Sequence, residues 1–596
     1  MTSAQAAKRD LGPLPEWDLS DLYPGRDSPA IERDLAVADA SAERFEARYA
    51  GRLAELDGDA LGEAIAEYEA IDEILGRIVS YASLAHAGAM DDPEVGRFFQ
   101  TMHERVTDIS TRVLFFTLEL NRLDDAALAA KMKAPAAARY GPWVRDQRVF
   151  RPHQLSDDLE KLLHEKSVAG RAAWIRLFDE TIDGLRFPID GKELTCAEAL
   201  HLLSDPDGGV RRSAAKVLGK VFGDNLRSFA LITNTLIKDK EIEDNWRNFA
   251  RPISSRNLSN HVEDEVVDAL IAAVRDAYPR LSHRYYRIKA RWFGVDALPY
   301  WDRNAPLPDE DAREIPWNEA RDTVLAAYER FSPEMSALGR RFFDNPWIDA
   351  GVRPGKSPGA FAHPTVPSAH PYLLLNYQGT PRDVMTLAHE LGHGVHQLLA
   401  AGQGALMADT PLTLAETASV FGEQLTFRAM LDAESEPRRR RAMLASKVED
   451  MLNTVVRQVA FCEFERRLHD ERRSGELTPA RIGDIWLDIQ GESLGESIRF
   501  EDEYRAYWSY IPHFVHSPFY VYAYAFGDCL VNSLYAVYQD AEAGFQDRYF
   551  DMLRAGGTLR HKELLAPFGL DASNPEFWSK GLDVIAAFID ELDAAV

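Results

Sequence analysis

Residues 380–393 read TPRDVMTLAHELGH, and this stretch decides how the middle of the chain folds. Thr380 is a residue type that caps helix N-termini, and Pro381 suits the first helical position. Asp383, three residues after Thr380, can complete a capping box by accepting a hydrogen bond from the backbone of the cap. The stretch therefore predicts a helix that begins near residue 381 and carries the HELGH sequence in its interior.

His389 and His393 have the spacing of two metal ligands on one helix. Residues four apart differ by about 40° in azimuth and about 6 Å in rise. Both imidazoles can therefore reach one Zn²⁺, with Zn–N bonds of about 2.0–2.1 Å. Glu390 lies about 100° round the helix and can face a metal-bound water as general base. The motif predicts a zinc hydrolase with one metal ion per chain.

A catalytic zinc needs a third protein ligand and an open position for water. The HExxHxxGxxH pattern does not supply this ligand, because position 396 holds His where the pattern has Gly and position 399 holds Leu. His396 lies about 60° away from the direction of His393 on the predicted helix. A ligand role for His396 is the minor alternative, and a polar neighbour on the helix edge is the simpler interpretation.

The better source of a third ligand is the segment LAETASVFGE at residues 414–423. Glu416 and Glu423 are seven residues apart and so share a face of a second predicted helix. One of them can bind zinc while the other holds a ligand histidine by a hydrogen bond. Small residues at 415, 418 and 422 would let the two helices approach closely.

These motifs resemble the thimet oligopeptidase and oligoendopeptidase F family of zinc metallopeptidases. The resemblance extends to WSYIPHFVHSPFYVYAYAFG at 508–527, to WDLSDLY at 17–23 and to the tail around 555–565. It implies a mainly α fold with two helical lobes around a deep substrate channel, and a small β element beside the zinc helix. It also implies cleavage of short peptides, because a narrow channel excludes folded proteins.

The resemblance implies a definite set of site residues. His389, His393 and Glu416 would hold the zinc ion, and Glu390 would be the general base. Glu423 would then be the carboxylate that orients a ligand histidine. The glycine-rich stretch GKSPGAF at 355–361 resembles the family segment that precedes the strand lining the substrate.

Composition excludes several classes of function. The chain has 596 residues with 68 basic and 95 acidic side chains, a formal net charge of −27. An acidic surface repels phosphate backbones, so we expect no nucleic-acid partner. The longest apolar runs fall short of 18 residues, so we expect no membrane span. Three cysteines without a CxxC pair favour a reducing compartment, and the N-terminal residues lack an apolar signal core. We predict a cytoplasmic protein, with no prediction of oligomeric state.

Helical periodicity dominates the chain, and two helix starts stand out. Asp92-Pro93 and Asn574-Pro575 each pair an N-cap residue with proline at the first helical position. The loop around 204–209 carries Pro, Asp and Gly, which marks a candidate boundary. We predict an N-terminal helical lobe at 1–203 and a zinc metallopeptidase catalytic region at 204–596.

Peptide hydrolysis passes through a tetrahedral oxyanion, which needs hydrogen-bond donors besides the metal. Tyrosine hydroxyls and imidazole N–H groups are suitable donors, and the segment after residue 510 contains several. We predict His513 and Tyr524 as donors, with Tyr520 next. If the segment after Pro518 is helical, Tyr520 and Tyr524 share one face and Tyr522 points elsewhere. The alternative is an aromatic core stripe whose hydroxyls bond to the backbone.

Residues 372–377, YLLLNY, form one of the few strand patterns in the chain. A strand edge can bind an extended peptide through its main chain and so tolerates varied side chains. We therefore predict Tyr372, Leu374 and Asn376 as substrate-binding residues. The alternative is a short buried strand within a helical protein.

The leading function is a cytoplasmic zinc endopeptidase that hydrolyses short oligopeptides by metal-activated water with a glutamate base. A close alternative is an exo-acting relative that removes C-terminal residues. A helical binding protein that keeps zinc as a structural element is the alternative from another class. Glu390 argues against it, because a structural site has no need of a carboxylate beside an open coordination position.

Overall fold

Helices make up 71% of the computed structural model, which describes residues 11–167, 169–307, 314–540 and 543–595. The strands in these ranges are two or three residues long and form three small sheets. The prediction of a mainly α fold is confirmed. Within the described ranges, no helix combines the length and the apolar composition that a membrane crossing requires.

The chain divides into two compact units that interleave in sequence. Unit 1 comprises residues 1–151, 312–433 and 541–569, and unit 2 comprises 152–311, 434–540 and 570–596. Residues on both sides of position 204 fall in unit 2. The predicted boundary between residues 203 and 204 therefore does not coincide with a boundary of the compact units. That residues 204–596 form the catalytic region stays a prediction.

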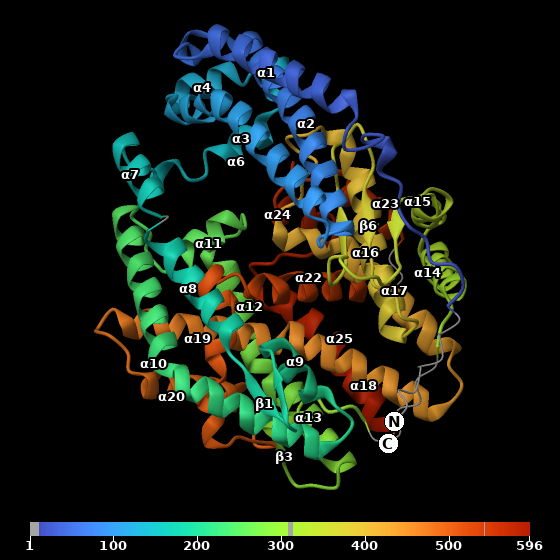
Figure 1. The fold of residues 1–596 in the computed structure, drawn as a ribbon. Helices are drawn as coiled ribbons and strands as arrows, with labels where there is room; N and C mark the ends of the chain where they lie inside the picture. Colours follow the sequence, from blue (N-terminus) through green and yellow to red (C-terminus); the bar gives the residue numbers. More distant parts are fainter. Residues whose placement is uncertain (1–10, 168, 308–313, 541–542, 596) are drawn as a thin grey trace. The chain divides into compact units, whose positions relative to one another are not determined.

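Unit 1 begins with three long helices, α1 to α3, that lie side by side (Figure 1). Asp92 caps α3 as its sequence predicts, with its carboxylate accepting from the N–H groups of Glu94 and Val95. The helices of unit 1 are α1 (Pro29–Tyr49), α2 (Gly58–Gly88), α3 (Pro93–Arg122), α4 (Asp125–Lys131), α5 (Pro135–Ala138), α6 (Gly141–Gln147), α14 (Trp317–Phe331), α15 (Pro333–Asp344), α16 (Pro381–Ala400), α17 (Leu412–Ala433), α23 (Phe545–Arg554) and α24 (His561–Leu565).

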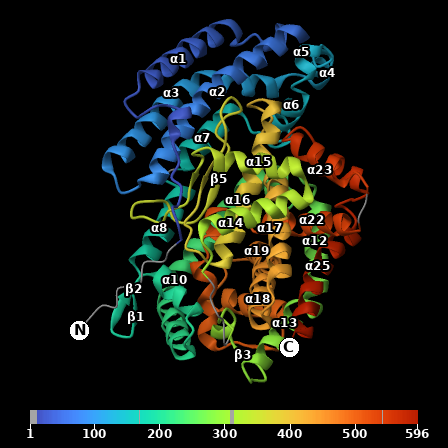
Figure 2. The same cartoon turned by 90° about the vertical axis from the view of Figure 1, so that its right-hand side faces the viewer.

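A three-stranded sheet in unit 1 lies against α16, with strand β5 beside the helix (Figure 2). The strands are β4 (Ile348–Asp349), β5 (Phe361–His363) and β6 (Tyr372–Leu374), in the order β4-β6-β5. β6 pairs with β4 in parallel and with β5 antiparallel. The small β element expected beside the zinc helix is therefore present.

Helices α16 and α17 pack against each other over most of their length (Figure 1). Thr380 and Asp383 form the predicted capping box, and α16 begins at Pro381. The close approach depends on Gly392, where an added Cβ would stand 2.4 Å from the carbonyl oxygen of Ala418. Gly422 on α17 makes a similar approach, since its Cβ would stand 2.3 Å from the hydroxyl of Tyr328.

Unit 2 is built around α10 and a group of helices from the C-terminal third of the chain. Asn574 caps α25 as predicted. The three cysteines of the chain are all buried thiols without a disulfide. The elements of unit 2 are α7 (Asp157–Ser167), α8 (Arg171–Gly184), β1 (Phe187–Ile189), β2 (Lys192–Leu194), α9 (Cys196–His201), α10 (Gly208–Trp246), α11 (Ser254–Ser259), α12 (Asp264–Ala277), α13 (Ser282–Trp292), β3 (Leu298–Pro299), α18 (Pro437–Thr454), α19 (Val456–Arg472), α20 (Pro479–Leu494), β7 (Ile498–Arg499), α21 (His513–His516), α22 (Tyr522–Gln539) and α25 (Pro575–Ala594).

The α16–α17 contact predicts opposite effects for two glycine substitutions. Gly392→Ala should lower the free energy of unfolding by about 1–3 kcal/mol, because the new methyl group meets backbone atoms that cannot move aside. Gly96→Ala on α3 is the matched control, because an added Cβ there meets nothing within 4 Å. That change should stabilise the protein by about 0.5–1 kcal/mol through helix propensity. Thermal unfolding of both variants checks the pair, and equal effects would contradict a close helix contact at Gly392.

Candidate metal centre

Helices α16 and α17 bring together His389, His393 and Glu416. Glu416 Oε2 lies 3.4 Å from His389 Nε2 and 3.6 Å from His393 Nε2. One candidate ligand atom from each of the three residues lies within 4.8 Å of those of the others. Two atoms each bonded to a tetrahedral zinc at 2.0–2.1 Å stand about 3.3 Å apart. The donor set and its spacing therefore fit a zinc ion held by these three residues.

Each histidine is held by a hydrogen-bond partner on its far side. His389 Nδ1 lies 3.3 Å from Glu423 Oε2, and the ring of His393 bonds to the backbone carbonyl of Ala415. Such partners fix the tautomer and orientation of metal-bound imidazoles. Glu416 and Glu423 thus divide the two tasks between them, with Glu416 facing both histidines and Glu423 behind His389.

The charges of this group shift one another. Burial lowers the pKa of His389, but the hydrogen bond to Glu423 and the charges of Glu416 and Glu390 outweigh it and raise the pKa to about 9. Burial raises the pKa of Glu416, but the two histidines and the hydroxyl of Ser419 bring it below its usual value. Burial lowers the pKa of His393 to about 4. These shifts favour an ionised Glu416 carboxylate and a protonated His389 imidazole at neutral pH.

Glu390 lies on the same helix as the two histidines but is not one of the three candidate metal ligands. Its side chain is buried, with the residue 7% exposed, and burial raises its pKa to about 7. The positive charge of His389 and a hydrogen bond from the backbone N–H of Ala362 on β5 act in the opposite direction. A carboxylate with a pKa near neutrality is suited to exchange protons at working pH.

His396 does not join the metal group, because only His389, His393 and Glu416 converge among the described residues. It is buried, and burial lowers its pKa to about 4. Its Nε2 lies 3.5 Å from the hydroxyl of Thr410. The structure thus favours the interpretation of His396 as a polar neighbour of the metal helix.

The prediction that residues 372–377 offer a free strand edge is wrong, because β4 and β5 occupy both edges of β6. Tyr372 and Leu374 are fully buried, and the hydroxyl of Tyr372 donates to the carbonyl of Asp18. Asn376 donates to the carbonyls of Ser357 and Gly359. These three residues therefore support the sheet and the glycine-rich loop.

The strand that faces Glu390 is β5, whose side away from β6 is unpaired with any described strand. Sequence reasoning missed it, because a three-residue strand is too short to show an alternating pattern. The available signal was the glycine-rich stretch 355–361, which runs directly into β5. Asp349 anchors this loop through a bidentate pair with Arg353 and a contact of 2.7 Å with the buried Lys356.

A cavity of about 320 Å³ lies in unit 1 beside His393 and His396. Its walls are mostly apolar or small side chains: Val366, Pro371, Leu398, Ala401 and Ala405. Asp409 and Thr410 are among its polar lining residues, and burial raises the pKa of Asp409. A cavity of this size next to a metal ligand can receive one apolar side chain of a bound molecule.

His513, Tyr520 and Tyr524 form a cluster in unit 2. The hydroxyl of Tyr524 lies 3.5 Å from His513 Nε2, and the rings of Tyr520 and Tyr524 are 5.4 Å apart. Tyr522 is fully buried and its hydroxyl accepts from the amide of Asn260. Tyr520 and Tyr524 thus meet and Tyr522 points elsewhere, although α22 begins only at Tyr522.

The loop before α22 is held by a buried carboxylate that sequence reasoning missed. Phe519 has a positive φ of 60°, which is uncommon for a bulky residue. Its N–H donates to Glu465 Oε1 on α19 at 2.8 Å, and Arg256 donates to the carbonyl of Pro518. Glu465 is 54 residues distant from Phe519 in sequence, so only the tertiary structure could reveal this contact.

The comparisons with known proteins place the chain in a family. Residues 201–584 match the profile of Peptidase family M3, and residues 119–187 match that of Oligopeptidase F. Oligopeptidase PepF of Bacillus subtilis is 25% identical over 592 residues, covering 97% of this chain and 86% of its own. The chain belongs to peptidase family M3 and is a metallo-endopeptidase.

Solved structures share its fold. A protein from Chlamydophila abortus superposes with a TM-score of 0.85 at 23% identity, covering 98% of both chains. Oligoendopeptidase F from Enterococcus faecium gives a TM-score of 0.71 at 22% identity, covering 95% of this chain and 98% of its own. The family resemblance predicted from the motifs is confirmed.

Glu465 predicts a pH-dependent difference in stability. Burial raises its pKa to about 8 from 4.5, although the Phe519 N–H and the charges of Arg256 and Lys240 oppose the rise. Between these pH values the folded protein binds a proton that the unfolded chain has released, so this group lowers stability as pH rises. Glu465→Gln should therefore gain stability relative to wild type from pH 5 to pH 8, by roughly 1–3 °C in Tm at the upper end.

The matched control is Glu476→Gln, at an exposed position beyond α19. Its Tm difference from wild type should stay flat over the same pH range. A flat difference for Glu465→Gln as well would contradict a protonated, buried carboxyl at this position.

Proposed function

We propose that this protein is a zinc-dependent endopeptidase that hydrolyses short oligopeptides. The observation that carries the proposal is the buried Glu390 beside the converging His389, His393 and Glu416. Three protein ligands leave the fourth position of a tetrahedral metal open for water and substrate, and the Glu390 carboxylate lies next to these ligands. Membership of peptidase family M3 supports the reaction class.

The residues divide the chemistry as follows. His389, His393 and Glu416 would hold one Zn²⁺, which supplies a Lewis acid that makes water a nucleophile near neutral pH. Glu390 accepts the proton of the attacking water and passes it to the leaving amine. Its pKa of about 7 suits both transfers, and the N–H of Ala362 holds its carboxylate in place. Glu423 keeps His389 oriented.

The substrate would bind along β5 as an extended chain. The edge of β5 that faces away from β6 lies next to Glu390, which already accepts from the Ala362 N–H. The remaining main-chain groups of this edge would hold the peptide backbone without selecting its side chains. The cavity beside His393 would receive one apolar side chain of the peptide. This arrangement supports broad specificity with one apolar preference near the cleaved bond.

His513, Tyr524 and Tyr520 are the proposed donors to the oxyanion, on the basis of their residue types and the family resemblance. The mutual contacts of the three rings support a shared task. The deep substrate channel that the family resemblance implies would restrict the enzyme to short peptides. A cytoplasmic location would suit the degradation of such peptides.

Glu390→Gln tests the proposal most directly. Glutamine has nearly the same shape but cannot accept the proton, so the variant should keep one zinc per chain and lose most of kcat. His389→Ala should lose both metal and activity. Zinc analysis and cleavage of an internally quenched peptide, with and without chelator, measure both. Normal turnover by Glu390→Gln would remove the general-base mechanism, and mass spectrometry of the products would show whether bonds inside the peptide are cut.

Two tyrosines on α22 separate an oxyanion donor from a core residue. Tyr524→Phe should lower kcat by about 10²–10³-fold with little change in KM, as for the loss of one oxyanion donor. Tyr522→Phe should leave kcat nearly unchanged but cost about 1 kcal/mol of stability, because the buried hydroxyl bonds to Asn260. Steady-state kinetics and thermal unfolding of both variants check the pattern, and the reverse pattern would mean that the wrong tyrosine has been chosen.

A further inference from the structure

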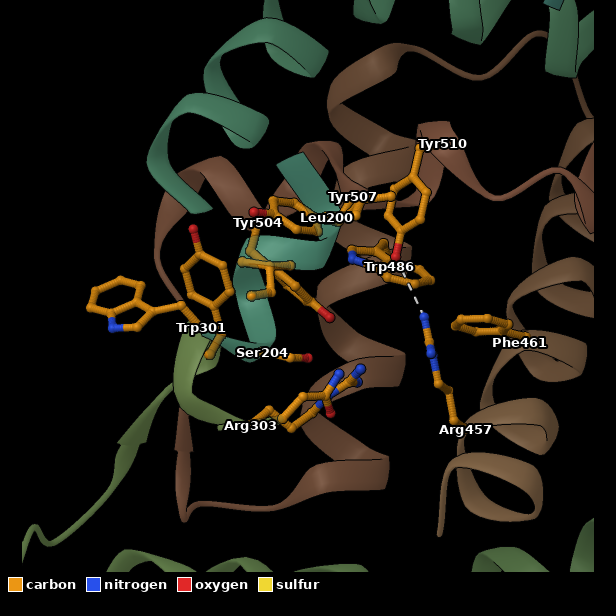
Figure 3. A pocket seen from close by; sticks show the side chains of 13 residues that line it. Leu200, Ser204, Trp301, Arg303, Arg457, Phe461, Trp486, Tyr504, Tyr507 and Tyr510 are labelled. Atoms are coloured by element: carbon orange, nitrogen blue, oxygen red, sulfur yellow. Dashed lines mark hydrogen bonds between the residues drawn. The ribbon is translucent and has the colours of Figure 1, made fainter. Parts of the chain in front are cut away.

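Unit 2 contains a second cavity, of about 190 Å³, that includes none of the proposed peptidase residues. Figure 3 shows its walls, which are mainly aromatic rings. They come from the 3₁₀ helices η6 (Tyr300–Asp302) and η8 (Asp502–Tyr510) and from α19 and α20. The space equals that of about six water molecules, enough for a single-ring compound.

The cavity is positively charged although the protein as a whole is acidic. Its lining includes Arg303 and Arg457 and no Asp or Glu. Figure 3 shows both guanidinium groups pointing into the same space. Against a formal net charge of −27, two arginines without a carboxylate in one cavity are an exception that calls for a compensating group.

Within the described residues, neither guanidinium forms an ion pair with an acidic side chain. The guanidinium of Arg303 makes no hydrogen bond or ion pair with them. Arg457 donates only to the hydroxyl of Tyr510, at 3.4 Å, and its Nε is buried without a described partner. Each guanidinium therefore keeps donors that a bound anion could use.

The nearby carboxylates are already paired with other groups. Glu449 accepts hydrogen bonds from Tyr285 and Lys289. Asp302 pairs with Arg211 at 2.8 Å, and Glu503 pairs with Lys216. Each of these acids has a hydrogen-bonded base of its own, and Glu449 acts on Arg303 only through its charge, without a hydrogen bond to the guanidinium.

Trp486 adds a further hydrogen-bond donor to the cavity wall. The indole N–H of Trp486 is buried and meets no acceptor within the described part of the chain. The hydroxyls of Tyr300 and Tyr507 donate outward, to Glu503 and to the carbonyl of Ala215. These two tyrosines therefore offer the cavity their rings, and the site combines cationic donors with flat apolar walls.

We propose that this cavity binds a small organic anion in which a carboxylate or phosphate is attached to a flat apolar ring. The guanidinium forks match the oxygens of either group bidentately, and the aromatic walls cover the ring. None of the proposed peptidase residues lines the cavity, although Tyr510 lies only three residues before His513. Binding is therefore measured directly, by calorimetry and thermal unfolding, and not through proteolysis.

The test uses the full-length, zinc-loaded protein and phenyl phosphate, benzoate and inorganic phosphate at fixed ionic strength with chloride. We expect saturable binding of phenyl phosphate or benzoate by calorimetry, with an increase in Tm, and weaker binding of inorganic phosphate, which lacks the ring. Preference for phenyl phosphate or for benzoate tells which oxyanion the site takes. Equal binding of all three, or no saturation at tens of millimolar, would overturn the proposal.

Variants locate the site. Arg303→Met should weaken binding by roughly 10–100-fold, as for the loss of a charged hydrogen-bond partner. Without ligand its Tm should equal or exceed that of wild type, because a partly buried charge without an ion-pair partner is removed. Arg303→Lys keeps the charge but not the fork, so it should fold and bind about tenfold more weakly.

Arg227→Met, at an exposed position on α10, is the matched control for loss of one positive charge. It should leave binding unchanged. Equal weakening by Arg227→Met would show a general charge effect, and unchanged binding by both Arg303 variants would place the anion elsewhere. Either result would refute the assignment.

Discussion

The close contact between α16 and α17 is the constraint on which the metal centre depends. His389 and His393 are neighbours by helix geometry alone, but the third ligand comes from another helix. Gly392, inside the HELGH sequence, allows α17 to approach until an added Cβ would collide with the Ala418 carbonyl. At this separation Glu416 reaches both histidines. The glycine between the two histidines thus permits the helix approach that brings in the third ligand.

The same packing brings several ionisable side chains close together at the metal centre, so that each shifts the pKa values of the others. Glu390, Glu416 and Glu423 lie around two half-buried histidines, and their negative charges raise the pKa of His389 to about 9. Histidine must be deprotonated at the nitrogen that binds a metal, so metal binding at such a site releases a proton. A divalent cation and a proton compete for the same negative surroundings. Glu390 lies at the edge of this field, and its burial keeps its pKa near neutrality.

In unit 2, an acidic group and two basic groups that are shielded from water differ in their protonation. Glu465 is kept in an apolar position where protonation removes the cost of burial, and in return it holds the backbone of Phe519 at a positive φ. Arginine cannot take this route, because its guanidinium stays protonated at any ordinary pH. Arg303 and Arg457 therefore keep their charge, which favours a ligand that brings the opposite one. The difference follows from the intrinsic pKa values of the two groups.

Local interactions made part of this protein readable from its sequence. The capping box at Thr380 and Asp383 and the i, i+4 spacing of the histidines both lie within one helix, so residue order alone predicts them. Residues 416 and 423 could be recognised as a pair, but their tasks depend on where α17 lies against α16. The strand edge was misassigned because pairing partners of β6 come from distant segments. The Glu465 contact and the arginine cavity likewise join segments far apart in sequence, and long-range contacts of this kind leave no periodic pattern in the residues themselves.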